Sequence, residues 1–265
     1  MAETFLAIIT AHLLGDFVLQ SNRMIKYKKN FCVLFSHVSI VTMFSAIFLG
    51  LFNWQILSSI LILHMMIDAI KINISDDSSS AFAIDQVVHI LILTCLAYIF
   101  SDIASTGWWP SILDENLLNR YYATLCLISG VIVAVPAGGF LIGKLTSQFM
   151  KELDEKDISG LKKGGRYIGW LERSMVMLLL LIKQPAGIGF LFTAKSILRF
   201  GELKDASQRK VAEYIIIGTF LSFGWALLIS VITQQTIQHW IPEKESTIQT
   251  IEVIINKQTE VENTD

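Results

Sequence analysis

The chain has 265 residues, of which 53% are hydrophobic and 17% are charged, and its formal net charge is -2. A soluble domain carries charge on nearer a quarter of its residues, so this composition excludes an ordinary soluble protein. With no basic tract, it also gives no sign of a nucleic-acid partner, and the expected partner is the lipid bilayer.

Several apolar runs approach the roughly 20 residues that a helix needs to cross a bilayer. The sequence therefore predicts an all-α polytopic membrane protein with about eight transmembrane helices. In chain order these cover residues 3–21, 32–52, 54–73, 82–101, 120–145, 166–183, 186–200 and 212–235.

The predicted helices fall into two groups. Residues 1–105 form a four-helix unit, and residues 106–240 form a second bundle with a charged loop at 147–164. Residues 241–265 form a polar tail, whose apolar run is compatible with a short strand or an interfacial helix.

Lysine and arginine are concentrated in the loops that follow the first, fifth and seventh predicted helices. Because positively charged loops stay in the cytoplasm, this side is expected to be cytoplasmic, and both termini are expected outside.

Four of the five histidines lie between residues 12 and 89, inside apolar runs that also hold three aspartates. Three pairs are four residues apart, which places the two side chains on one helix face, one turn apart. The full set is His12, Asp16, His37, His64, Asp68, Asp85 and His89.

The spacing of this set repeats along the chain. A shift of 52 residues places His12 on His64, Asp16 on Asp68 and His37 on His89, and only Asp85 lacks a counterpart. This predicts a duplicated helical hairpin that forms a pseudo-twofold four-helix unit.

The predicted topology puts all seven groups in the cytoplasmic half of the bilayer, where burial of charge is costly. An aspartate at a helix centre costs roughly 2.5–3.5 kcal/mol, so three of them require compensation. Imidazole and carboxylate groups suit a divalent transition metal. Zinc is preferred, with manganese or iron as alternatives.

Several arrangements of the cluster remain open. Seven ligands would suit two metals, one per hairpin and bridged by Asp85, or one metal with further carboxylates that orient the imidazoles. A proton or ion relay is a third reading, and polar contacts that only hold the helices together are a fourth.

Polar and cationic groups surround the cluster, and one of them, Lys71, is a candidate for binding an anionic substrate. Gln20, Lys28, Lys71 and Gln86 lie around the cluster, and Lys71 follows Asp68 by three residues. Lys71 can hold an anion, or it can extend to the lipid headgroups.

The second bundle carries a further polar set, in which Arg173, Lys195 and Arg199 can form a phosphate pocket. Ion pairs Glu172–Arg199 or Arg173–Glu202 are the structural alternative. Gly139-x3-Gly143 and Gly165-x3-Gly169 allow close contact between helices.

Several segments resemble a known family. AHLLGDFVLQ, HMMIDAIK and IDQVVH are similar to the bacterial membrane family called domain of unknown function 3307. GRYIGWLERS and FLFTAKSILRFGELKD are similar to the C-terminal part of many members, so the resemblance extends to about residue 235. It implies a multi-pass protein of the bacterial inner membrane and carries no activity with it.

More loosely, helices with intramembrane histidine and aspartate resemble membrane-bound metal-dependent hydrolases, which is an analogy only. We therefore expect a hydrolase at the inner leaflet that acts on a lipid-linked or polar phosphoester. Asp85 is the expected general base, and Lys71 with Arg173, Lys195 and Arg199 would steady a phosphate.

Two rival functions remain open. One is a transporter or channel that moves protons or a cation through the histidine–aspartate pairs. The other is a membrane partner of a soluble effector that binds the charged loop at 147–164. A homo-oligomer is compatible with each of these functions.

Overall fold

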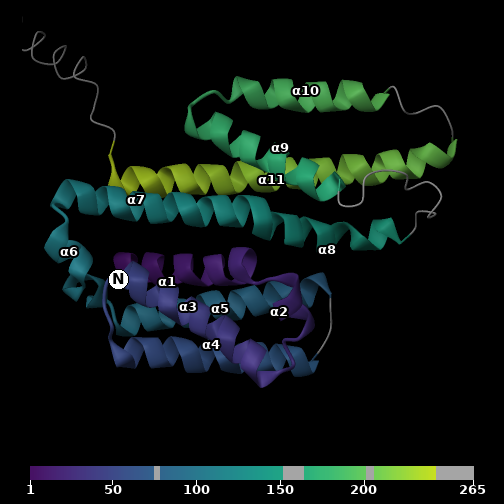
Figure 1. The fold of residues 1–265 in the computed structure, drawn as a ribbon. Helices are drawn as coiled ribbons and strands as arrows, with labels where there is room; N and C mark the ends of the chain where they lie inside the picture. The colour runs from purple at the N-terminus through teal and green to yellow at the C-terminus, as the bar shows by residue number, and fades with distance from the viewer. Residues whose placement is uncertain (75–77, 152–163, 201–205, 243–265) are drawn as a thin grey trace, which may run out of the picture.

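The computed structural model describes residues 1–74, 78–151, 164–200 and 206–242, and every regular element in these residues is helical (Figure 1). The fold is therefore all-α, as predicted. The long helices of the first half are α1 (Ala2–Leu14), α3 (Phe31–Leu49), α4 (Trp54–Ile74) and α5 (Ser79–Ile99), and α1 continues as the π-helix η1 (Gly15–Leu19). In the second half, α7 (Glu115–Ile132) continues through the π-helix η3 (Val133–Ala137) into α8 (Gly138–Met150). The remaining long helices are α9 (Gly164–Leu181), α10 (Ala186–Phe200) and α11 (Ala206–Trp240). The short elements are α2 (Asn22–Lys26), η2 (Ile103–Thr106) and α6 (Trp108–Ile112).

Six of these helical stretches, within the described residues, are long and apolar enough to cross a membrane. They are Ala2–Leu19, Phe31–Leu49, Trp54–Asn73, Ser79–Ile99, Glu115–Met150 and Lys210–Trp240. The chain is thus an all-α polytopic membrane protein. α9 and α10 match the sixth and seventh predicted spans, but α9 carries three charged residues and the apolar part of α10 is short. The count of eight spans stays a prediction.

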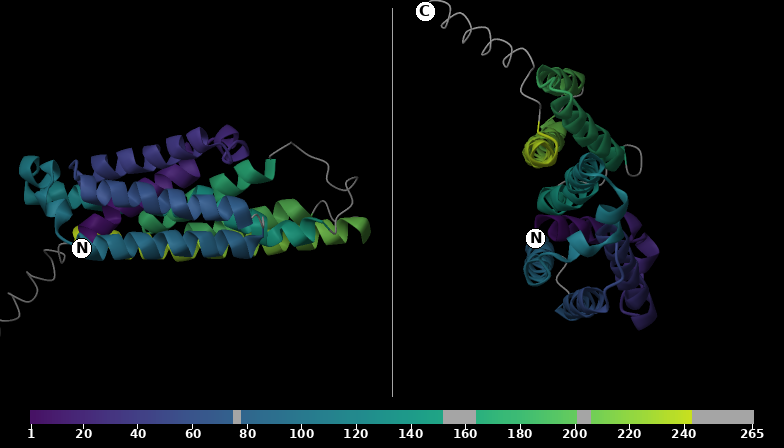
Figure 2. Two further views of the ribbon diagram at one scale, coloured as in Figure 1. Left: turned by 90° about the horizontal axis from the view of Figure 1, so that it is seen from below. Right: turned by 90° about the vertical axis from the view of Figure 1, so that its left-hand side faces the viewer.

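The N-terminal four-helix unit is formed by α1, α3, α4 and α5. α1 and α4 each pack against both α3 and α5, so the four helices enclose a common interior. The continuous α7–α8 helix and α11 lie on the other side of α1, and α9 and α10 lie beyond them (Figures 1 and 2). α1 joins the two halves, since it packs on α7, where Thr10 Oγ1 and Ser129 Oγ lie 2.8 Å apart.

Polar caps determine where several of these helices begin. The side chains of Asn30, Ser78 and Asp114 accept hydrogen bonds from backbone N–H groups in the first turns of α3, α5 and α7. Such caps satisfy donors that have no partner within the helix. α3 ends at Gly50, which adopts the left-handed conformation (φ 71°), and the Trp109 ring packs against its Cα.

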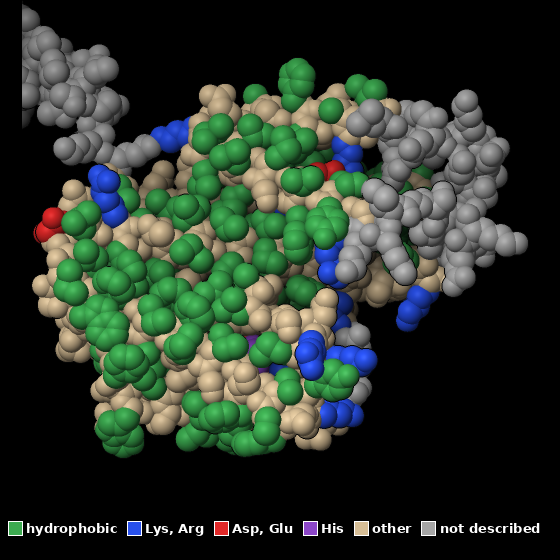
Figure 3. Space-filling view, in the orientation of Figure 1, with side chains coloured by type: hydrophobic (Ala, Val, Ile, Leu, Met, Phe, Trp, Pro, Cys, Tyr) green, Lys and Arg blue, Asp and Glu red, His purple; other side chains and the backbone are tan. Residues whose placement is uncertain are grey.

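The two ends of the molecule differ in charge. The beginning of α1 and the end of α11 lie at one end, which we call the terminal end (Figure 1). Lysine and arginine gather at the opposite end, beside α2, which we call the lysine-rich end (Figure 3). This distribution matches the asymmetry predicted from the loops. Most of the loop at 147–164 and nearly all of the tail at 241–265 lie outside the described residues.

Candidate metal centre in the N-terminal four-helix unit

All four helices of the N-terminal unit contribute to one buried cluster, which we call the His/Asp cluster. Its side chains are at most 9% exposed, and contacts link them into one network. The members are His12 from α1, Asp16 from η1, His37 from α3, His64 and Asp68 from α4, and Asp85 and His89 from α5. The structure therefore brings together the seven residues that the sequence selected.

The first group in the cluster surrounds Asp16 Oδ1. This oxygen lies 3.3 Å from His37 Nε2 and 3.6 Å from both His64 Nε2 and His12 Nδ1. Asp68 Oδ2 lies 3.6 Å from the same Nε2 atoms of His37 and His64. Ligands placed about 2.1 Å from a tetrahedral zinc ion are separated by about 3.4 Å, so these spacings suit a metal site.

A second group lies next to the first. Ligand atoms of Asp68, Asp85 and His89 lie within 4.8 Å of one another, as do those of His12, His64 and His89. Asp68 therefore stands between the two groups, and the first group draws on both hairpins. This grouping differs from the expected arrangement of one metal per hairpin bridged by Asp85.

The cluster contains many buried polar atoms that lack a hydrogen-bond partner among the described residues. They include both ring nitrogens of His12, Nε2 of His37, His64 and His89, and one or more carboxylate oxygens of Asp16, Asp68 and Asp85. Leaving one such atom unsatisfied costs about 1–3 kcal/mol. Because they are all nitrogen and oxygen donors facing one another, the residues fit a divalent transition metal.

The π-helix η1 determines where Asp16 lies. A π-helical turn is wider than an α-helical turn and often occurs at functional sites. Gly15 opens this turn, and a Cβ atom at Gly15 would collide with Cγ2 of Val41 on α3. The equivalent stretch of α4 is an ordinary α-helix. The two hairpins are thus similar but not identical, and duplication stays a prediction.

Two lysines compensate two of the three aspartates. Lys28 Nζ lies 2.8 Å from Asp68 Oδ2, and Lys71 Nζ lies 2.5 Å from Asp85 Oδ2, which also accepts a hydrogen bond from Gln86. The sequence placed Lys28 near the cluster but gave it no role. Nothing in the sequence separates it from the exposed neighbour Lys29.

The structure does not bring Arg173 or Lys195 to the His/Asp cluster, since the α7–α8 helix lies between α9 and the N-terminal four-helix unit and α10 lies beyond α9 (Figures 1 and 2). Lys195 Nζ pairs with Glu172 Oε2 at 2.7 Å, and the predicted pairs Glu172–Arg199 and Arg173–Glu202 stay predictions. The Arg199 side chain and Glu202 lie outside the described residues.

The Arg173 side chain is buried and donates hydrogen bonds to a backbone carbonyl. Its Nε and Nη2 atoms donate to the Val135 carbonyl at 3.3 and 2.9 Å, and Nη1 donates to Ser222 Oγ at 3.0 Å. Val135 lies in η3, which contains Pro136, and Trp225 Nε1 donates to the nearby Val133 carbonyl at 2.9 Å. The Val133 and Val135 carbonyls therefore accept from side chains in addition to the Gly138 N–H, in a turn that Pro136 disturbs.

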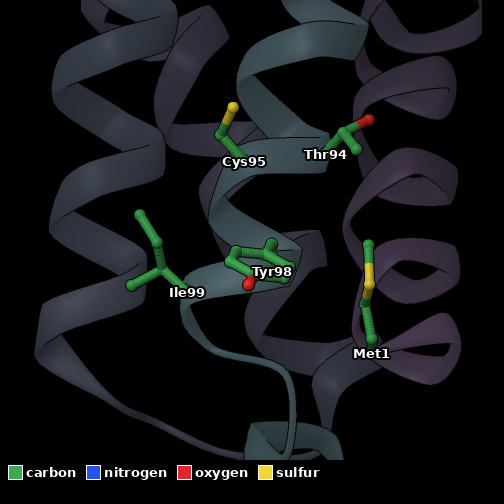
Figure 4. A pocket seen from close by; sticks show the side chains of 5 residues that line it. All are labelled: Met1, Thr94, Cys95, Tyr98 and Ile99. Atoms are coloured by element: carbon green, nitrogen blue, oxygen red, sulfur yellow. The ribbon is translucent and has the colours of Figure 1, made fainter.

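Two cavities lie at the terminal end of the molecule. One, of about 360 Å³, is lined by Met1, Thr94, Cys95, Tyr98 and Ile99 (Figure 4). The other, of about 440 Å³, lies between α1 and α11. No residue of the His/Asp cluster lines either cavity.

Fold and site together define a polytopic membrane protein with a buried His/Asp cluster in its N-terminal four-helix unit. Residues 4–115 match the model of the family described as Protein of unknown function (DUF3307), and this match supports the family resemblance seen in the sequence. The match includes the whole His/Asp cluster and ends at the start of α7. No curated protein and no solved structure matched the chain.

Proposed function

We propose that the protein is an intramembrane metal-dependent hydrolase of the bacterial inner membrane. The observation that supports this proposal is the convergence of buried imidazole and carboxylate atoms at separations of 3.3–3.6 Å, close to the distance between ligands of one zinc ion. Zinc is the preferred metal, and manganese or iron would suit the same donors.

Each group in the cluster has a role in this proposal. Asp16, His37 and His64 would hold the first metal, and Asp68, Asp85 and His89 would hold a second. A bound divalent ion lowers the pKa of water and polarises the scissile group. Among the described residues Asp85 Oδ1 has no hydrogen-bond partner, so Asp85 would act as general base where it is not fully engaged by the metal.

The proposed substrate is a lipid-linked or polar phosphoester at the inner leaflet. The position of the cluster supports this class, since Lys28 and Lys71 lie beside it at the lysine-rich end. Arg173 has no part in substrate binding in this proposal, because its guanidinium group is bound to Val135 and Ser222.

A proton- or cation-coupled transporter is the second candidate. The imidazole rings form a continuous series of contacts, with ring centroids 5.4 Å apart for His37 and His64, 4.6 Å for His64 and His89, and 4.8 Å for His89 and His12. Such a series is what a proton relay through the unit would require.

The metal content of the purified protein tests the first proposal. Elemental analysis is expected to find about one or two transition-metal ions per chain, bound more weakly as the pH falls, because a protonated imidazole cannot bind a metal. His64→Ala or Asp68→Ala should remove both the metal and phosphoesterase activity and still allow membrane insertion.

His239→Ala is the matched control, because this histidine lies near the end of α11 at the terminal end of the molecule. It should keep both metal and activity. Metal-free protein that conducts protons or cations in liposomes would overturn the hydrolase and favour the transporter.

A further inference from the structure

The Asp68 oxygen that faces the histidines of the candidate metal position is the same oxygen that holds Lys28, whereas in Asp85 Oδ1 faces His89 and the other oxygen holds Lys71. Asp68 Oδ2 lies 3.6 Å from the Nε2 atoms of His37 and His64, and the same atom lies 2.8 Å from Lys28 Nζ. Asp85 belongs to the second group of ligands and is held by Lys71. A metal ion and Lys28 would therefore compete for Asp68 Oδ2, and a metal ion and Lys71 would share the negative charge of the Asp85 carboxylate.

The charges of the cluster lead to the same conclusion. With neutral imidazoles, three aspartates and the two paired lysines leave one net negative charge. One divalent ion would leave one net positive charge, and two would leave three. Repulsion between cations is strong in a buried site of low dielectric constant, so a metal ion and both lysines cannot all remain in place without further compensation.

The lysine pairs also differ in burial. The Lys28 side chain is only 15% exposed and its partner Asp68 is 1% exposed, whereas the Lys71 side chain is 42% exposed. Solvent weakens an exposed pair, so Lys28 should oppose metal binding more than Lys71. Lys28 lies in the short connection between α2 and α3, which can move without unfolding a long helix.

We propose that Lys28 and Lys71 are internal counter-cations that a metal displaces from Asp68 and Asp85, and that the displaced ammonium groups then bind a phosphate anion. The Gln20 Nε2 donor is buried and has no partner among the described residues, and Gln20 lies between η1 and α2. A phosphate oxygen accepts hydrogen bonds from ammonium and amide donors. Metal and anion would thus bind cooperatively, because each compensates the charge left by the other.

This inference rests on the metal centre of the proposed function, and its first test uses the wild-type protein. Purified protein in maltoside micelles is treated with an amine-reactive reagent with and without zinc, and lysine labelling is measured by mass spectrometry. Zinc should raise the labelling of Lys28 several-fold. Lys29, which is exposed, should be labelled equally in both conditions.

A zinc titration of Lys28→Gln provides the second test, with Lys29→Gln as the matched control. Removing the competing cation should raise zinc affinity about fivefold over wild type, equivalent to about 1 kcal/mol. Lys71→Gln should have a smaller effect, and Lys29→Gln should bind zinc as the wild type does. Equal affinities for Lys28→Gln and Lys29→Gln, or weaker binding by Lys28→Gln, would overturn the displacement. A wild type that binds no zinc at all would instead overturn the proposed function.

The anion is tested with two sources of the same chemistry. Inorganic phosphate, or phosphatidylglycerol mixed into the micelles, should raise the zinc affinity of the wild type about fivefold and leave that of Lys28→Gln unchanged. An effect of phosphatidylglycerol alone identifies a lipid headgroup, and an effect of phosphate alone identifies a free anion. If neither changes zinc affinity, the anion site is overturned.

Discussion

At the scale of single residues, Arg173 shows that a buried charged side chain in this protein can form hydrogen bonds with the backbone. Its guanidinium group is fixed by Val135 and Ser222, and two glycines lie against it. A Cβ atom at Gly139 would lie 2.8 Å from Nη2, and one at Gly169 would lie 2.9 Å from Nη1. The glycines that the sequence suggested for close helix contact thus provide space for this side chain.

Gly139→Ala should therefore destabilise the protein, by about 1–3 kcal/mol as for other overpacked sites. The added methyl group would push the guanidinium group from the carbonyl of Val135. Gly143→Ala is the control, since nothing lies within 4 Å of its Cβ position, and alanine should be neutral or stabilise α8 by up to about 1 kcal/mol. Thermal unfolding in detergent measures both. Equal melting temperatures would contradict this role of Arg173.

At the scale of elements, the π-helix η1 is the feature that distinguishes the first hairpin, formed by α1 and α3, from the second, formed by α4 and α5. It lies between α1 and α2 and carries Asp16, whose Oδ1 atom is close to three imidazoles. Gly15 allows η1 to approach Val41 on α3. The position of this one turn therefore controls the geometry of the first group of ligands.

Gly15→Ala should weaken zinc binding by about tenfold or more, because the new methyl group would push η1 away from α3 and displace Asp16 from the histidines. Far-UV circular dichroism should still show a helical protein. The double variant Gly15→Ala/Val41→Ala removes the colliding methyl groups and should recover most of the zinc affinity. A Gly15→Ala protein that binds zinc as tightly as wild type would contradict this account of η1.

At the scale of the whole molecule, the distribution of charge predicts the orientation in the membrane. The lysine-rich end contains α2, while α6 lies at the terminal end (Figures 1 and 3). Lys28, which follows α2, is paired with Asp68 of the His/Asp cluster. Positive loops are retained in the cytoplasm, so the metal centre should belong to the inner leaflet.

Cysteine labelling in intact cells tests this orientation. In a background where Cys32, Cys95 and Cys126 are replaced by alanine, Ser111→Cys should react with an impermeant thiol reagent. Lys29→Cys should react only after the cells are opened. The reverse pattern would move the metal centre to the outer leaflet and exclude a cytoplasmic phosphoester as its substrate.

The sequence by itself determined the membrane-spanning character and the membership of the His/Asp cluster. Runs of apolar residues define helices locally, because backbone hydrogen bonds must be satisfied inside the bilayer. A spacing of four puts His12 beside Asp16 and His64 beside Asp68, and the cost of exposing them to lipid requires them to face the interior.

Only the tertiary structure decided which partners these residues have. In the folded chain, Lys28 rather than Lys29 pairs with Asp68, and Arg173 donates to the Val135 carbonyl. Asp68 lies between the two groups of ligands. These contacts depend on how far each helix is rotated and shifted against its neighbours. That arrangement results from packing between distant segments, such as Gly15 against Val41, and no local pattern of residues encodes it.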